Sequence, residues 1–128
     1  MTQTFVIPIA AIGAPRMTRR DTWKKRPCVV AYHQWRDIVR AHCKDVPSAD
    51  RVEALRVYCR FVPPGSMRRR KVVCGSLKRT KPDVDNIAKA VMDCLWEQDQ
   101  AIADVRVRKV WSLDENMQIE IESAPSAE

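Results

Sequence analysis

Residues 53–62 read EALRVYCRFV and carry the clearest secondary-structure signal in the chain. The apolar residues at 55, 57, 59 and 61 alternate with Arg56, Tyr58 and Arg60. Because successive side chains of a strand point to opposite faces of a sheet, this alternation predicts a strand with one apolar and one polar face. The Pro63-Pro64-Gly65 sequence that follows ends the strand, since proline cannot donate a hydrogen bond to a neighbouring strand.

The segments on either side of this strand complete an α+β pattern. Period-two alternation predicts further strands over residues 2–10, 103–111 and 117–122, and apolar residues at helical spacing predict helices over 29–43 and 85–95. The order is strand, helix, strand, loop, helix, strand, strand. It predicts one α+β domain over residues 1–128, with a small mixed β-sheet and helices packed on one of its faces.

The composition is that of a globular protein without a membrane segment. Of the 128 residues 45% are hydrophobic, which is enough for a core. No apolar run approaches the roughly 20 residues that a membrane-spanning helix needs. The N-terminal residues also lack the basic start and apolar stretch of a signal peptide. We therefore expect a cytoplasmic protein that makes no contact with a membrane.

The cysteines do not form a metal-binding or disulfide pattern. Their number is odd, they are widely scattered along the chain, and none belongs to a Cys-x-x-Cys pair. We therefore expect buried or half-buried free thiols at Cys28, Cys43, Cys59, Cys74 and Cys94.

The chain has a formal net charge of +7. Its positive charge is concentrated in two stretches, residues 16–26 and residues 63–82. Residues 63–82 hold seven basic residues and no acidic one, and their length and polarity predict a mobile loop that orders on a ligand. Segregated charge of this kind suits a polyanion, most often nucleic acid, although solvated loops with incidental charge are the alternative. The candidate DNA contacts are Arg16, Arg19, Arg20, Arg68, Arg69, Arg70, Lys71, Lys78, Arg79 and Lys81.

Two aspartates lie close together where an extended stretch enters the second predicted helix, in the sequence DVDN at residues 83–86. Alternation in an extended stretch would place Asp83 and Asp85 on the same side, and Lys89 follows one helical turn later. Such a group suits Mg²⁺, which activates water and neutralises phosphate charge in phosphodiester cleavage. The alternative is helix capping, which needs only one of Asp83, Asp85 and Asn86. The spacing alone leaves both interpretations open.

Residues 81–95, KPDVDNIAKAVMDCL, resemble the signature of the RusA family of Holliday-junction resolvases, many of which are encoded by phages or prophages. That signature is a Pro-Asp-x-Asp-Asn-x-x-Lys-x-x-x-Asp-x-Leu run, followed by an aspartate that leads into a strand. Residues 99–109, DQAIADVRVRK, resemble its second half. The strand with its Pro-Pro-Gly end and basic loop, and the sequence GAPRMTRR at residues 13–20, also match the usual layout of the family.

The resemblance implies a magnesium-dependent homodimer that cuts two symmetric strands of a four-way DNA junction, in DNA recombination and repair. Mn²⁺ is the expected substitute metal. By motif position, Asp83, Asp85 and Asp99 are the implied catalytic aspartates and metal ligands, and Lys89 is the implied essential lysine.

The chain departs from the family pattern near the third aspartate. The linker from Asp93 to Asp99 is shorter than is common, and the usual Asp-Asp pair is Gln98-Asp99 here. Glu97 and Asp104 are therefore alternatives to Asp99 as the third ligand. We interpret Asp93 as a structural partner of Lys89 on the helix face.

Two other classes of function are weighed against the nuclease. One is a catalytically inactive, DNA-binding accessory protein of the same fold, which the retained aspartates and lysine argue against. The other is an RNA-binding module, which would use exposed aromatic side chains to stack on bases. The four tryptophans are Trp23, Trp35, Trp96 and Trp111, and they lie mostly at positions typical of a core.

Overall fold

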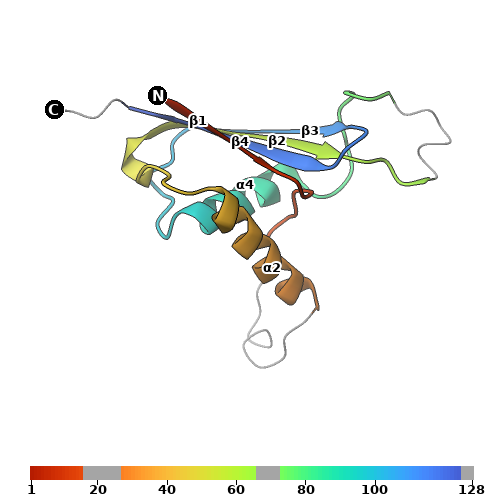
Figure 1. Cartoon of the computed structure of the whole chain (residues 1–128), viewed down its shortest axis with the longest axis horizontal. Helices are drawn as coiled ribbons and strands as arrows, with labels where there is room; N and C mark the ends of the chain where they lie inside the picture. Colours follow the sequence, from red (N-terminus) through yellow and green to blue (C-terminus); the bar gives the residue numbers. More distant parts are fainter. Residues whose placement is uncertain (16–26, 66–72, 125–128) are drawn as a thin grey trace.

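Both α-helices lie against the same face of a four-stranded mixed sheet (Figure 1). The structure is a computed structural model of the chain, and it describes residues 1–15, 27–65 and 73–124. Within these residues the strands are β1 (Thr2–Ile7), β2 (Val52–Phe61), β3 (Val105–Trp111) and β4 (Asn116–Ser123). The helices are α2 (Pro27–His42) and α4 (Val84–Leu95), with one short 3-10 helix, η1 (Ala49–Arg51). None of the described helices is both long and apolar enough to cross a membrane.

The strand order is β1-β4-β2-β3, so the last strand in sequence lies inside the sheet. β4 pairs antiparallel with both β1 and β2, whereas β2 and β3 are parallel. Parallel neighbours need a long crossover connection, and here α4 forms part of it. The predicted α+β class, the order of the elements and the position of the helices on one face are confirmed.

The register of the sheet follows the alternation in β2. Leu55 pairs with Ile121 and Val57 with Ile119, and all four side chains are fully buried. Arg56 points to the other face, where its guanidinium donates a hydrogen bond to Glu122 at 2.6 Å. A slip of one residue would move Arg56 into the core, so the apolar pattern specifies a single register.

The two helices are joined near the C-terminal end of α4. The guanidinium of Arg40, in the last turn of α2, donates a hydrogen bond to the carbonyl oxygen of Cys94 at 2.8 Å. The indole of Trp96 donates to the carbonyl oxygen of Pro47, also at 2.8 Å. The last carbonyl groups of a helix have no partner inside the helix, so the Arg40 contact satisfies one of them.

Some boundaries and burial states differ from the prediction. β1 ends at Ile7 instead of residue 10, and α2 begins at Pro27 instead of residue 29, because proline is well suited to the first turn of a helix. All five cysteines are free thiols, as predicted. Two of them, Cys28 and Cys74, are exposed, which corrects the expectation that all five are at least half-buried. Buried positions are confirmed for Trp35, Trp96 and Trp111, and Trp23 lies outside the described residues.

Candidate active site

Asp83 is the N-cap residue of α4, and its backbone carbonyl accepts the hydrogen bond from the Ile87 amide at 3.0 Å. The residue is exposed, with extended backbone angles of φ −74° and ψ 147°. Among the residues that the structure describes, the Asp83 carboxylate makes no capping hydrogen bond. Helix capping therefore does not account for the presence of a carboxylate at this position.

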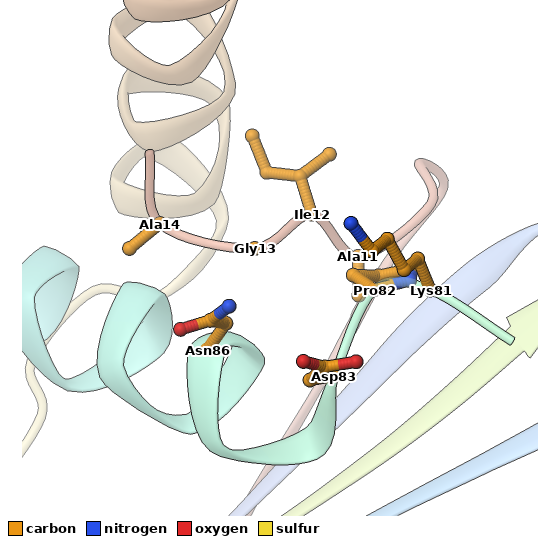
Figure 2. Close-up of a pocket in the computed structure, with 8 residues that line it drawn as sticks. All are labelled: Ala11, Ile12, Gly13, Ala14, Lys81, Pro82, Asp83 and Asn86. Atoms are coloured by element: carbon orange, nitrogen blue, oxygen red, sulfur yellow. The ribbon is translucent and has the colours of Figure 1, made fainter. Parts of the chain in front are cut away.

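The Asp83 side chain lines a pocket of about 450 Å³ between the start of α4 and the segment 11–14 (Figure 2). The two walls are in contact, because the Ala14 amide donates a hydrogen bond to the carbonyl oxygen of Asn86 at 3.3 Å. A side chain at Gly13 would bring a Cβ atom to 3.2 Å from the Asn86 Cβ. Glycine at this position therefore permits the close approach of the segment to the helix. Lys81 lies on the rim of the same pocket.

Asp85 lines a different pocket, of about 390 Å³, between α4 and β3. It shares this pocket with Arg106, which the sequence analysis did not single out. The expectation that Asp83 and Asp85 lie on one side assumed that the helix begins at Asp85. The helix begins at Val84, so Asp85 belongs to its first turn and follows the helical rotation of about 100° per residue.

The Asp99 carboxylate is close enough to Asp93 to influence its pKa. Partial burial of the Asp93 carboxyl group and the neighbouring charge of Asp99 raise the pKa of Asp93, whereas the charge of Lys89 lowers it. Lys89 and Asp99 thus both act electrostatically on Asp93, but no ion pair between Asp93 and Lys89 forms among the described residues. Asp99 is half-buried, whereas Glu97 and Asp104 are exposed.

Over residues 1–15, 27–65 and 73–124, no group of three or more carboxylate, histidine or cysteine side chains is close enough to hold a metal ion by itself. A closed structural metal site is therefore absent from this part of the chain. Mg²⁺ does not require such a cage, because it retains several waters and binds through one or two carboxylates and a substrate phosphate. The exposed carboxylates of Asp83 and Asp85 fit that donor chemistry, and the half-buried Asp99 carboxylate is of the same type.

The predicted DNA-binding residues separate into three groups. Arg79 and Lys81 are exposed, as that prediction requires. Lys78 is only 8% exposed, and its ammonium lies 4.9 Å from the centre of the Phe61 ring and 5.0 Å from that of Trp111. Burial, followed by the charge of Lys109, lowers the pKa of Lys78. The remaining predicted contacts lie outside the described residues: Arg16, Arg19, Arg20, Arg68, Arg69, Arg70 and Lys71.

The Lys78 ammonium is directed into the protein, whereas its assignment as a DNA contact assumed an exposed side chain. Its ammonium points inward and donates hydrogen bonds to the Thr80 hydroxyl at 2.7 Å, to the Thr80 carbonyl oxygen at 3.1 Å and to the Lys81 carbonyl oxygen. Membership of a basic run gave no signal for this burial. The two aromatic residues that cover Lys78 lie at the ends of strands far from it in sequence.

Comparison with known proteins assigns the chain to a family. The sequence profile described as Endodeoxyribonuclease RusA matches residues 8–122, which include both pockets and the Asp93–Asp99 pair. A search of curated proteins gave no match. The profile covers nearly the whole chain, and the chain therefore belongs to the RusA family of Holliday-junction-resolving endodeoxyribonucleases.

Proposed function

We propose that this resolvase cuts branched DNA with Mg²⁺ held by Asp83, Asp85 and Asp99 together with a substrate phosphate, and with Lys89 acting on that phosphate. Among the described residues these carboxylates do not form a closed metal site by themselves, so the phosphate and waters would complete it. The observation that carries the proposal is the Asp83 carboxylate, which is exposed in a pocket and, within the described residues, takes no part in capping α4. An acid that is not needed for the fold at this position is available for a ligand.

The start of α4 also suits a phosphate group. The first amides of a helix and its dipole favour a negative charge, and Lys81 adds a cation on the pocket rim. When bound, Mg²⁺ would supply an activated water and neutralise charge on the phosphate. Lys89 is exposed one turn after Asp85 and would hold a fixed positive charge near the developing negative charge.

Asp99 is the preferred third ligand because of its neighbours. Its charge raises the pKa of Asp93, and Lys89 acts on the same carboxyl group in the opposite direction. A cation at Asp99 would relieve the repulsion between the two carboxylates, which is the effect that raises the pKa of Asp93 after burial. Glu97 and Asp104 are exposed, whereas Asp99 is half-buried.

The DNA substrate is the reason for two further parts of the proposal, the homodimer and the basic residues that contact phosphates. A four-way junction offers two symmetric strands, and a homodimer with two-fold symmetry would present one active site to each. Arg79 and Lys81 are the described cations that we assign to backbone phosphates, because contacts to phosphates supply most of the non-specific affinity for DNA. The basic residues at 16, 19, 20 and 68–71 are assigned to the same role from their charge alone.

The proposal is tested with a synthetic mobile four-way junction and a linear duplex of matched sequence, each with Mg²⁺ and with a chelator. Wild type should cut only the junction, and only with Mg²⁺ or Mn²⁺. Asp83→Asn should bind the junction in chelator at least as tightly as wild type, because it removes a negative charge near the phosphates. It should cut at background rate, because a neutral amide does not replace the carboxylate as a metal ligand. The matched control is Asp45→Asn, which changes an exposed aspartate between α2 and η1. Normal cleavage by Asp83→Asn would refute the metal site, and binding by wild type without any cleavage would indicate an inactive DNA-binding protein.

A further inference from the structure

Three consecutive backbone carbonyl groups directly before Asp83 are bound by two lysine side chains. The ammonium of Lys109 donates hydrogen bonds to the carbonyl oxygens of Thr80 and Pro82, both at 2.7 Å. The ammonium of Lys78 donates to the carbonyl oxygens of Thr80, at 3.1 Å, and Lys81. We call Lys78 and Lys109 the lysine clamp. Together they occupy every carbonyl group from residue 80 to residue 82.

The clamp is anchored to the parallel pair of strands. Lys109 belongs to β3, two residues before Trp111. Trp111 is paired with Phe61 of β2, and the rings of these two residues flank the Lys78 ammonium at 5.0 and 4.9 Å. β3 lies at the edge of the sheet, and it pairs with the interior strand β2 along its whole length. The clamp therefore connects the residues before Asp83 to the sheet.

The chain that carries Lys78 is itself pinned along β3. The Gly75 amide donates a hydrogen bond to the carbonyl oxygen of Trp111 at 2.7 Å, and the Trp111 amide donates to the carbonyl oxygen of Ser76 at 3.0 Å. The Lys78 amide donates to the carbonyl oxygen of Lys109, also at 3.0 Å. Residues 75–78 therefore run beside β3 like a short extra strand, and both members of the clamp start from adjacent positions.

Packing alone does not explain a lysine at the buried position 78. Moving an ammonium out of water is unfavourable, and a hydrophobic residue of similar volume is often tolerated as well or better in a buried slot. In the described part of the chain, neither Lys78 nor Lys109 forms an ion pair with a carboxylate. Their partners are neutral oxygens of one short segment, so the distinctive contribution of both ammonium groups is to hold that segment.

We infer that Lys78 and Lys109 are positioning residues of the nuclease, which fix the backbone of residues 80–82 so that the Asp83 carboxylate enters its pocket at the start of α4. The inference rests on the proposed function, because it takes Asp83 to be a metal ligand. Neither lysine touches the DNA in this role. Both act through the backbone, in the way that supporting contacts hold a ligand to within a fraction of an ångström.

The clamp is tested with Lys109→Met, Lys109→Arg and Lys78→Met, with Lys44→Met as the control at an exposed lysine after α2. Cleavage of the junction by Lys109→Met should slow on the order of 10- to 100-fold, the scale for misplacing a reacting group by about 1 Å. The Mg²⁺ concentration for half-maximal cleavage should rise, and junction binding in chelator should stay at the wild-type level. Lys109→Arg should recover most of the rate, because it restores a donor to the carbonyl groups.

A second measurement does not depend on metal or on activity. The Ile87 amide is bonded to the Asp83 carbonyl at 3.0 Å, so its hydrogen exchange in the metal-free protein reports the start of α4. Exchange of this amide should be faster in Lys109→Met and unchanged in the Lys44→Met control. Wild-type exchange together with wild-type Mg²⁺ dependence would overturn the inference, even if Lys78→Met fails to fold. An active Asp83→Asn protein would instead overturn the proposed function, and the two failures are thus measured separately.

Discussion

The two ends of α4 are built in opposite ways. At the C-terminal end Arg40 binds the Cys94 carbonyl oxygen, and the buried Trp96 binds Pro47, so polar groups there are satisfied within the protein. At the N-terminal end two exposed aspartates line two pockets. The difference places two of the three proposed metal ligands at the N-terminal end of α4 and the Arg40 and Trp96 hydrogen bonds at its C-terminal end. Substitutions of Asp83 and Asp85 should therefore change cleavage more than folding, and substitution of Arg40 should do the reverse.

The largest effect is expected at the remaining proposed ligands. Asp85→Asn and Asp99→Asn should each reduce junction cleavage in Mg²⁺ to background, because each removes the anion while preserving size. Gel assays measure cleavage, and binding in chelator measures whether the folded protein still recognises DNA. Normal cleavage by Asp99→Asn would mean that Glu97 or Asp104 is the third ligand. Glu97→Gln and Asp104→Asn would then be tested in the same assays.

Lys89→Ala should lower the cleavage rate by roughly 100-fold or more, the scale for losing an electrostatic donor in an active site. The melting temperature should change little, because Lys89 is exposed. An exposed ion pair between residues four apart on a helix contributes only about 0.3–0.5 kcal/mol to stability. Rates under single-turnover conditions and thermal melting separate the two contributions. A variant that melts early and cuts normally when folded would make Lys89 part of the scaffold.

The Cys94 thiol, near the C-terminal end of α4, should react slowly with alkylating reagents. Burial, opposed by Arg40 and Arg36, raises the pKa of Cys94 to about 11. Alkylation of the native protein at pH 8 should therefore be at least about 10-fold slower at Cys94 than at the exposed Cys74. Because the pKa of Cys94 is above its ordinary value of 9.0, its contribution to stability is complete below pH 9 and is lost as the pH rises to about 11. Mass spectrometry of the labelled protein checks the first expectation, and denaturant unfolding between pH 8 and 11 checks the second.

Arg40→Ala should lower the free energy of unfolding by about 1 kcal/mol, the scale for one hydrogen bond to a partly exposed charged group. It should leave the cleavage rate of the folded protein unchanged, because the contact lies at the opposite end of α4 from Asp83. Urea unfolding and cleavage are measured on the same preparation. A large loss of cleavage without loss of stability would show that the two ends are not independent.

The smallest effect is expected at Asp93. Because its pKa is raised, its charge opposes folding at neutral pH, and this penalty disappears as the pH falls below its ordinary value of 3.8. Asp93→Asn should therefore stabilise the metal-free protein at pH 7 by less than about 0.5 kcal/mol, since the group is largely exposed to solvent. Melting in chelator at pH 7 and at pH 3.5 measures the difference. Lower stability of Asp93→Asn at pH 7 would show that pairing with Lys89 outweighs repulsion by Asp99.

The sequence predicted the sheet because β2 carries its register in its own alternation. Leu55 and Val57 are buried and Arg56 lies on the other face, as period-two alternation requires. It could not predict the relative directions of Asp83 and Asp85, because these depend on whether a helix begins at residue 84 or 85. Such a shift of one residue is within the uncertainty of helix ends, yet it moves Asp85 to a different pocket.

The sequence also could not predict which individual basic side chains are buried and which are exposed. Lys78 and Lys81 lie three residues apart in one basic run, and only Lys81 is exposed. Lys78 is buried because Phe61 and Trp111 come together when β2 and β3 pair in parallel, and such a non-local contact has no local sequence signal. Arg106 reaches the pocket of Asp85 for the same reason, since β3 approaches α4 only in the folded domain.

The interior position of β4 has a consequence for synthesis of the protein on the ribosome. β4 lies between β1 and β2, so residues 2–7 find their partner only when residues 117–122 have been made. Chains emerge from the ribosome N-terminal end first, and until β4 emerges β1 has no neighbour and β2 lacks one of its two. The sheet on which the clamp and both pockets rest is therefore completed only after residues 116–123 have emerged, so a nascent chain that lacks β4 cannot assemble the nuclease.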